Sequence, residues 1–155
     1  MITVNLTQLR MLEGWLEKEP LSHRKVAFPF YNATGTENSS VVYFELEPGH
    51  SLGTHTDSAE EIILILQGNA ELSLGEEVGQ LIKNEMAIIP IMIPHNVRNI
   101  GIGTLKVIGF FSSSNVESTF LEPVMPLNQK IAGAPPIPTD HPLTWNEIAN
   151  KIIPS

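Results

Sequence analysis

Four side chains that can bind a divalent metal are the most distinctive chemical feature of the sequence. His55, Asp57 and Glu61 lie close together and lead directly into the aliphatic stretch at residues 62–66, whereas His95 follows a later apolar stretch. Residues two apart in an extended segment point to the same face, so His55 and Asp57 are expected to project together. Two imidazoles and two carboxylates suit a borderline transition metal, whereas an all-oxygen calcium site would not use the histidines.

The composition excludes several other kinds of chemistry. The chain has no cysteine, which removes disulfide frameworks, thiolate zinc sites, iron–sulfur clusters and cysteine nucleophiles. Its net charge is −8, and its lysines and arginines do not cluster, so a nucleic acid is not expected as a partner. A chain of 155 residues is long enough for one domain with its own core, and we expect residues 1–155 to form a single domain.

Short stretches rich in β-branched and aromatic residues predict the elements that position these side chains. They follow one another at short intervals, separated by Gly, Pro, Asn and Ser, with no helical pattern between them. This organisation is typical of an antiparallel sandwich or barrel. The stretches occupy residues 26–31, 40–47, 61–67, 70–74, 86–93, 96–100 and 104–112.

Both ends of the chain are predicted to contain short helices around a barrel core at about residues 26–112. In residues 1–20, apolar side chains recur at helix-like spacing. Residues 113–155 begin as a proline-rich segment that is expected to wrap around the barrel. They end in a predicted helix, where Thr144 and Glu147 have the spacing of a capping box.

The spacing of the ligand candidates resembles the first motif of the cupin superfamily, G(X)5HXH(X)3,4E(X)6G. The motif positions are taken by Gly49, His55, Glu61 and Gly68, and Asp57 stands where the family has its second histidine. The second motif, G(X)5PXG(X)2H(X)3N, is matched more loosely. Its matching positions are Pro90, His95 and Asn99, with Met92 in place of a glycine.

The resemblance covers about residues 40–112 and implies an all-β fold, a small antiparallel jelly-roll barrel. It implies that a metal is held inside the barrel by His55, Glu61 and His95, with Asp57 as the fourth ligand. Aspartate makes such a site more anionic, which favours iron or manganese over copper, while nickel and zinc stay open. A metal with free coordination positions suits a dioxygenase-like oxidoreductase, which is the activity we expect.

Other interpretations remain open at this point. The barrel could be a non-catalytic binding module for a metal or a small molecule, or a metal-dependent isomerase or lyase. A narrower ligand set of His55, Asp57 and His95 would form the two-histidine, one-carboxylate triad of the iron(II)/2-oxoglutarate type. In that case Lys106 could pair with a cosubstrate carboxylate.

The expected substrate is a small apolar or aromatic molecule, because Met92 would place a flexible apolar side chain near the barrel mouth. The candidate pocket residues are Phe28, Phe30, Tyr43, Ile63, Met92 and Phe110. The N-terminus lacks a signal-peptide pattern and no apolar run approaches about 20 residues, so we expect a cytoplasmic protein without a membrane partner. A homodimer is expected, because sheet edges need cover and single-domain cupins commonly pair.

Overall fold

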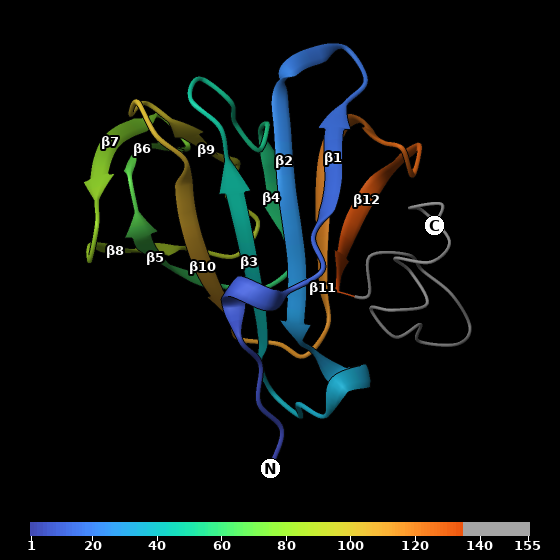
Figure 1. The fold of residues 1–155 in the computed structure, drawn as a ribbon. Coiled ribbons are helices and arrows are strands. Elements are labelled where there is room, and N and C mark those ends of the chain that lie inside the picture. Colours follow the sequence, from blue (N-terminus) through green and yellow to red (C-terminus); the bar gives the residue numbers. More distant parts are fainter. Residues whose placement is uncertain (135–155) are drawn as a thin grey trace.

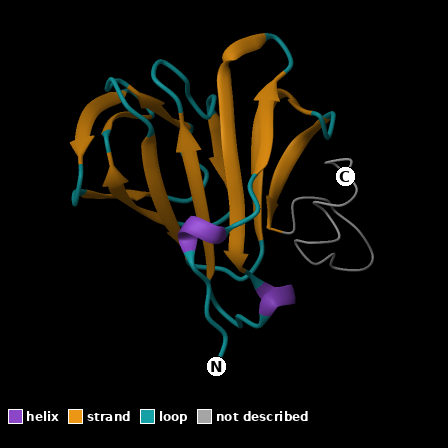
Figure 2. Ribbon diagram, in the orientation of Figure 1, coloured by secondary structure: helices purple, strands orange, loops and turns teal. Residues whose placement is uncertain are grey.

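The computed structural model describes residues 1–134, and these form one continuous antiparallel sheet that curls into a nearly closed barrel (Figures 1 and 2). The order of strands is β7-β6-β9-β4-β11-β1-β2-β3-β10-β5-β8, with β12 added to β11. The strands are β1 Leu12–Leu16, β2 Glu19–Phe30, β3 Ser40–Leu46, β4 His55–Asp57, β5 Glu61–Gln67, β6 Asn69–Leu74, β7 Glu77–Ile82, β8 Met86–Ile89, β9 His95–Asn99, β10 Leu105–Phe111, β11 Val116–Met125 and β12 Gln129–Ala134.

The core follows from the two-residue alternation of the strands. In β5, Glu61, Ile63 and Ile65 are buried, while the side chains between them are more exposed. The pairing Phe111↔Glu61 continues this inner face onto β10. The alternation therefore places the carboxylate of Glu61 in the same inward row as the aliphatic core.

Strand β4 is short, and its neighbours bring distant parts of the chain to the site. It pairs with β11 on one side, with Phe120 opposite His55 and Ser118 opposite Asp57. On the other side it pairs with β9, where His95 lies opposite His55. Three separate segments therefore meet around β4.

The predicted N-terminal helix is wrong. The helical content of this segment is one 3-10 turn, η1 (Leu6–Gln8), and a second 3-10 turn, η2 (Asn32–Thr34), lies further along the chain. Leu12–Leu16 is a strand in which Leu12, Gly14 and Leu16 face inward, so the apolar spacing reflects a period of two. In so short a segment the helical and extended periods share several positions, and pairing with β2 and β11 selects the strand.

The described residues include only the beginning of the C-terminal segment, residues 113–134, which was predicted to wrap around the barrel. Strands β11 and β12 occupy the beginning of the segment that was expected to be a proline-rich wrap. The predicted helix at residues 144–152 and most of the proline-rich stretch lie outside the described residues. Within residues 1–134, no helix has both the length and the apolar character needed to cross a membrane.

Candidate metal centre

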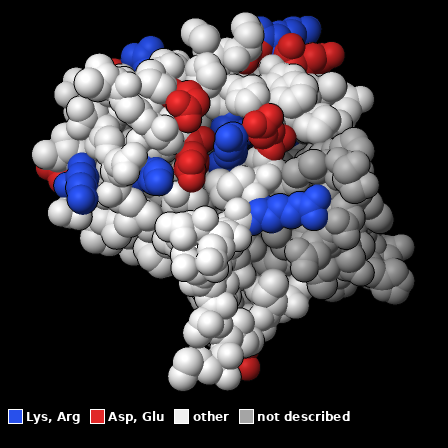
Figure 3. Space-filling view, viewed as in Figure 1, with Lys and Arg blue, Asp and Glu red and all other residues white. Residues whose placement is uncertain are grey.

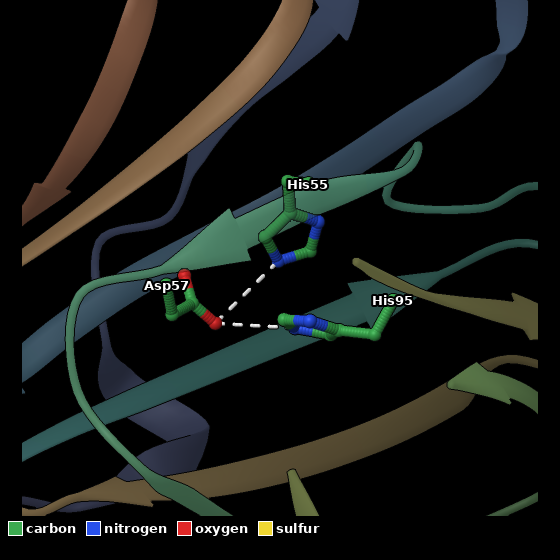
Figure 4. A group of neighbouring side chains, drawn as sticks. All are labelled: His55, Asp57 and His95. Atoms are coloured by element: carbon green, nitrogen blue, oxygen red, sulfur yellow. Dashed lines mark ion pairs between the residues drawn. The ribbon is translucent and has the colours of Figure 1, made fainter. Parts of the chain in front are cut away.

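The metal-ligand candidates are brought together by β4 and β9. His55 and Asp57 project from the same face of β4, and His95 is the first residue of β9 (Figure 4). The centroids of the two imidazole rings are 4.2 Å apart. All three side chains are buried, with exposed fractions of 8%, 1% and 2% for His55, Asp57 and His95.

The distances between ligand atoms are those of a compact site. Oδ2 of Asp57 lies 3.1 Å from Nε2 of His95 and 3.8 Å from Nε2 of His55 (Figure 4). One ligand atom from each of the three residues lies within 4.8 Å of the other two. A single ion could therefore contact all three residues.

The backbone determines which nitrogen of each ring faces the site. Nδ1 of His55 lies 2.8 Å from the carbonyl oxygen of Gly53, and Nδ1 of His95 lies 2.9 Å from that of Ile93. A carbonyl oxygen only accepts hydrogen bonds, so Nδ1 carries the proton in each neutral ring. Both Nε2 atoms then present a lone pair to the site, as metal-binding histidines do.

Two atoms of the site are buried without a hydrogen-bond partner, Oδ2 of Asp57 and Nε2 of His95. They face each other at 3.1 Å, and with Nδ1 protonated both are acceptors. Two buried acceptors at this distance repel each other unless a cation or a proton lies between them. The residues present therefore fit a divalent metal ion.

Glu61 lies beside these three residues and slightly further away. It is the first residue of β5, it is 4% exposed, and its Oε2 atom lies 3.9 Å from Nε2 of His95. Gly109 of β10 lies against its carboxyl group, where a Cβ atom would overlap the carboxylate. The absence of a side chain at Gly109 thus provides the space that Glu61 occupies.

Burial and neighbouring charges set the protonation states of the metal-free site. Burial lowers the pKa of His55 to about 4, so this ring is neutral near pH 7. Burial alone would raise the pKa of Asp57, but its interactions with His95 and His55 and the hydrogen bond from Ser118 hold that pKa below its usual value. Burial, followed by the negative charge of Asp57, raises the pKa of Glu61 well above its usual value.

Ser118 is a site residue that sequence reasoning missed. Its hydroxyl donates a hydrogen bond to Oδ1 of Asp57, which leaves Oδ2 directed at His95. Ser118 belongs to β11, 61 residues away in sequence, and no pattern in the sequence links it to Asp57. It fixes the orientation of the residue that replaces the second motif histidine.

A cavity beside the candidate ligands has a mostly apolar wall. The volume that the centre of a water molecule can reach is about 80 Å³, and the cavity opens toward solvent. His55, Asp57 and Glu61 line it together with Ser118 and Arg24. The remaining lining residues are Val26, Phe28, Val42, Phe44, Leu52, Phe111, Phe120, Ala132 and Gly133.

Of the six predicted pocket residues, Phe28 lines this cavity and the others do not. Ile63 is buried in the aliphatic core, whereas Phe110 and Met92 are 42% and 56% exposed. The hydroxyl of Tyr43 donates a hydrogen bond to Glu45. Phe30, at the end of β2, does not line the cavity. Lys106, the alternative partner for a cosubstrate carboxylate, does not line it either.

The aromatic wall instead comes from sequence neighbours of two of these residues. Phe44 and Phe111 line the cavity in place of Tyr43 and Phe110. Adjacent residues of a strand face opposite sides, so a shift of one position exchanges the inner and outer faces. Phe120 was missed altogether, although its ring stacks on His55 with a centroid distance of 4.7 Å.

Residues 42–111 match the family described as Cupin domain, and this segment runs from within β3 to the end of β10 and includes all four candidate ligands. Residues 42–111 belong to the cupin superfamily. A search of curated proteins gave no significant match. The family assignment confirms the resemblance seen in the motif spacing.

Several solved structures share the cupin fold. An oxalate oxidase structure is 20% identical with a TM-score of 0.61, and the match covers 67% of this chain and 57% of that one. A putative sugar phosphate isomerase from Acidithiobacillus ferrooxidans is 15% identical with a TM-score of 0.61, covering 77% and 80% of the two chains. The polyketide cyclase RemF from Streptomyces resistomycificus is 20% identical with a TM-score of 0.59, covering 72% and 78%. At these identities the likeness concerns the fold alone.

Proposed function

We propose that this cupin binds one divalent transition metal and uses it to oxidise a small molecule, in the manner of a dioxygenase. The proposed ligands are His55, Asp57 and His95, with Glu61 as the fourth. The observation that carries the proposal is the pair of buried, unpartnered acceptor atoms, Oδ2 of Asp57 and Nε2 of His95, which face each other at 3.1 Å.

The donor set favours iron or manganese. Two imidazole nitrogens and one or two carboxylate oxygens are borderline-to-hard ligands, and the lack of sulfur in the set disfavours copper(I). When bound, such a metal would supply Lewis acidity and redox chemistry to a substrate in the cavity.

The protein's own residues contribute positioning, a proton and the exclusion of water. The Nδ1 hydrogen bonds hold both imidazoles in the orientation needed for ligation, and Ser118 does the same for Asp57. In the metal-free site Glu61 holds a proton at its carboxyl group, because burial favours the neutral form, and it releases that proton when it ligates the metal. Phe44 and Phe111 belong to the apolar wall, which limits the access of water to the substrate.

The set of lining residues favours oxidation over proton-transfer chemistry. An isomerase or lyase needs a base close to its substrate. Apart from the proposed ligands, the polar side chains among the lining residues are Arg24 and Ser118, and neither is a strong base near pH 7. A metal-dependent isomerase or lyase, in which an unligated Glu61 accepts the proton, remains the second candidate.

Metal content followed by oxygen uptake tests the proposal. Protein purified without a histidine tag should carry about one iron or manganese per chain, and His95→Ala should carry much less. Metal at a hundred times its dissociation constant should stabilise the fold by about 2.7 kcal/mol. The loaded protein should then consume oxygen with a member of a small-molecule panel, and the same panel assayed for isomer formation addresses the second candidate. Absence of bound metal, together with no thermal shift on adding iron, manganese, nickel or zinc, would contradict the proposal.

The proposal includes a homodimer formed through the outer face of β10, β5 and β8. Phe110, Ile62 and Ile88 lie next to one another across these strands and are 42%, 36% and 61% exposed. An exposed strip of this kind on an edge strand favours association. On the face shown in Figure 3, Lys and Arg side chains are separated and interspersed with Asp and Glu, which gives no support to a polyanionic partner.

A further inference from the structure

Arg24 is a buried cation in the wall of the metal-site cavity. It lies on β2, is 6% exposed, and lines the same cavity as His55, Asp57 and Glu61. Its guanidinium carbon lies 5.0 Å from the centroid of the Phe120 ring, and that ring also stacks on His55. The positive charge of Arg24 further lowers the pKa of His55, consistent with their proximity.

The guanidinium group has few partners within the protein. Nη1 donates a hydrogen bond to the carbonyl oxygen of Leu52 at 3.0 Å. Among residues 1–134, no carboxylate oxygen lies within 4.0 Å of its nitrogens. Arginine carries five N–H donors in a planar fork that matches a carboxylate, and a buried charge without a counter-ion is costly. Desolvation accordingly lowers the pKa of Arg24 to about 10, which leaves it charged near pH 7.

The charges around the cavity favour an anion. The net charge of the site is about +2 when a divalent metal, ionised Asp57 and Arg24 are counted and Glu61 is protonated. It falls to about +1 if Glu61 ionises on binding the metal. Most of the other lining residues are apolar, so they do not compensate this excess. A bound molecule with one or two negative charges would neutralise it.

We propose that Arg24 binds a carboxylate group of the substrate, so that the substrate is a small carboxylate held between Arg24 and the metal centre. The inference rests on the proposed function for the neighbouring metal. The cavity is small, with about 80 Å³ open to the centre of a water molecule, and this favours a compact substrate around its charged group. This substrate class replaces the apolar or aromatic molecule expected from Met92, whose side chain is exposed and does not line the cavity.

The experiment compares small carboxylates with their uncharged amides in four proteins. Acetate, glycolate and malonate, and the corresponding amides, are titrated calorimetrically into wild type, Arg24→Met, Arg24→Lys and Arg98→Met. Arg98 is the matched control because it is exposed and paired with Glu71. Each titration is performed on metal-free and on manganese-loaded protein.

We expect metal-free wild type to prefer at least one carboxylate over its amide, and Arg24→Met to weaken that carboxylate by about 10- to 100-fold. Arg24→Lys should retain part of the preference, while Arg98→Met should match wild type. Manganese affinity should stay within a few-fold of wild type in all variants, because Arg24 is not a proposed ligand. Equal carboxylate affinity in wild type and folded Arg24→Met would overturn the inference.

Two further readouts keep the inference and the proposed function separable. If Arg24→Met does not fold, the Nε–H resonance of Arg24 in ¹⁵N-labelled wild type, assigned with Arg24→Lys, should shift on adding the carboxylate but not the amide. An unmoved resonance would overturn the inference. Failure to load any metal, with the carboxylate preference intact, would instead contradict the proposed function and leave the role of Arg24 standing.

Discussion

Gly109→Ala should damage the metal centre through Glu61. A Cβ atom at position 109 would overlap Oε1 of Glu61 and would lie 3.1 Å from its Cδ and 2.8 Å from Cγ1 of Val42, whereas ordinary contact begins near 3.4 Å. The carboxyl group is the far end of a longer, flexible side chain than that of Val42, so most of the adjustment falls on the carboxyl group. The carboxyl must then withdraw by more than the roughly 0.5 Å that a functional ligand position tolerates.

The expected magnitude follows from these three close approaches. Overpacking a filled interior typically costs about 1–3 kcal/mol, so the metal-free protein should melt several degrees lower. Displacing a group that ligates or supports the metal typically costs about 10- to 100-fold in metal affinity. Manganese titration and thermal unfolding of the metal-free form measure the two effects separately.

Gly79→Ala is the control, since a Cβ atom at Gly79 meets nothing within 4 Å. It should leave metal affinity unchanged. A double-mutant cycle with Glu61→Ala isolates the mechanism: Gly109→Ala should have little further effect on metal affinity once the carboxylate is gone. If Gly109→Ala binds manganese as tightly as wild type, Glu61 is not a ligand and the site has three protein ligands.

The remaining predictions concern Asp57, Glu61 and the outer face. Asp57→Ala should weaken metal binding by at least about tenfold without abolishing it, whereas Asp57→His should retain metal and shift selectivity toward nickel, copper or zinc; unchanged titrations for both would remove Asp57 from the ligand set. Because the folded-state pKa of Glu61 is raised, its contribution to the stability of the metal-free protein is present below about pH 4.5 and is lost as pH rises through that higher pKa. In denaturant unfolding at a series of pH values, Glu61→Gln should remove this loss of stability. A pH profile of stability equal to that of wild type would contradict the prediction. In light scattering, Ile62→Asp should convert the dimer to a 17.1 kDa monomer. The control Val78→Asp, at an exposed site on β7, should remain dimeric. A wild-type protein that is monomeric would refute the proposed dimer.

The elements that build the barrel wall could be predicted because their signal is local. The apolar stretches at residues 40–47, 61–67 and 104–112 correspond to β3, β5 and β10. Each is rich in β-branched or aromatic residues and is followed by Pro, Gly or Ser. The motif spacing likewise identified candidate ligands from two segments without any knowledge of how the strands pair.

Residues contributed by strand pairing could not be found in this way. Arg24 and Phe120 enter the cavity from β2 and β11, and Ser118 meets Asp57 only through the pairing of β11 with β4. Strand β11 mixes charged, hydroxyl and apolar residues, so its own sequence gives little periodic signal. Its register against β4 depends on contacts between segments about 60 residues apart.

Phe110 was predicted to line the cavity, but its neighbour Phe111 does so instead. The alternation of a strand does not determine which of two adjacent residues faces inward. A period of two indicates which residues share a face but not which face is inside. Glu61 could have resolved this, because a motif carboxylate must face inward. If Glu61 faces inward, Ile63 and Ile65 of β5 must also face inward. Which residues of β10 face inward still depends on the pairing of Phe111 with Glu61.

Asp57 and Arg24 are best understood together, as opposite charges facing one cavity. A histidine at position 57 would leave the metal and Arg24 uncompensated, whereas ionised Asp57 removes one positive charge and keeps Oδ2 directed at the site through Ser118. Asp57→His should therefore strengthen the binding of small carboxylates to the manganese-loaded protein, while Arg24→Met weakens it. The two substitutions act on the same anion in opposite directions, and a purely steric role for either side chain would not produce that pattern.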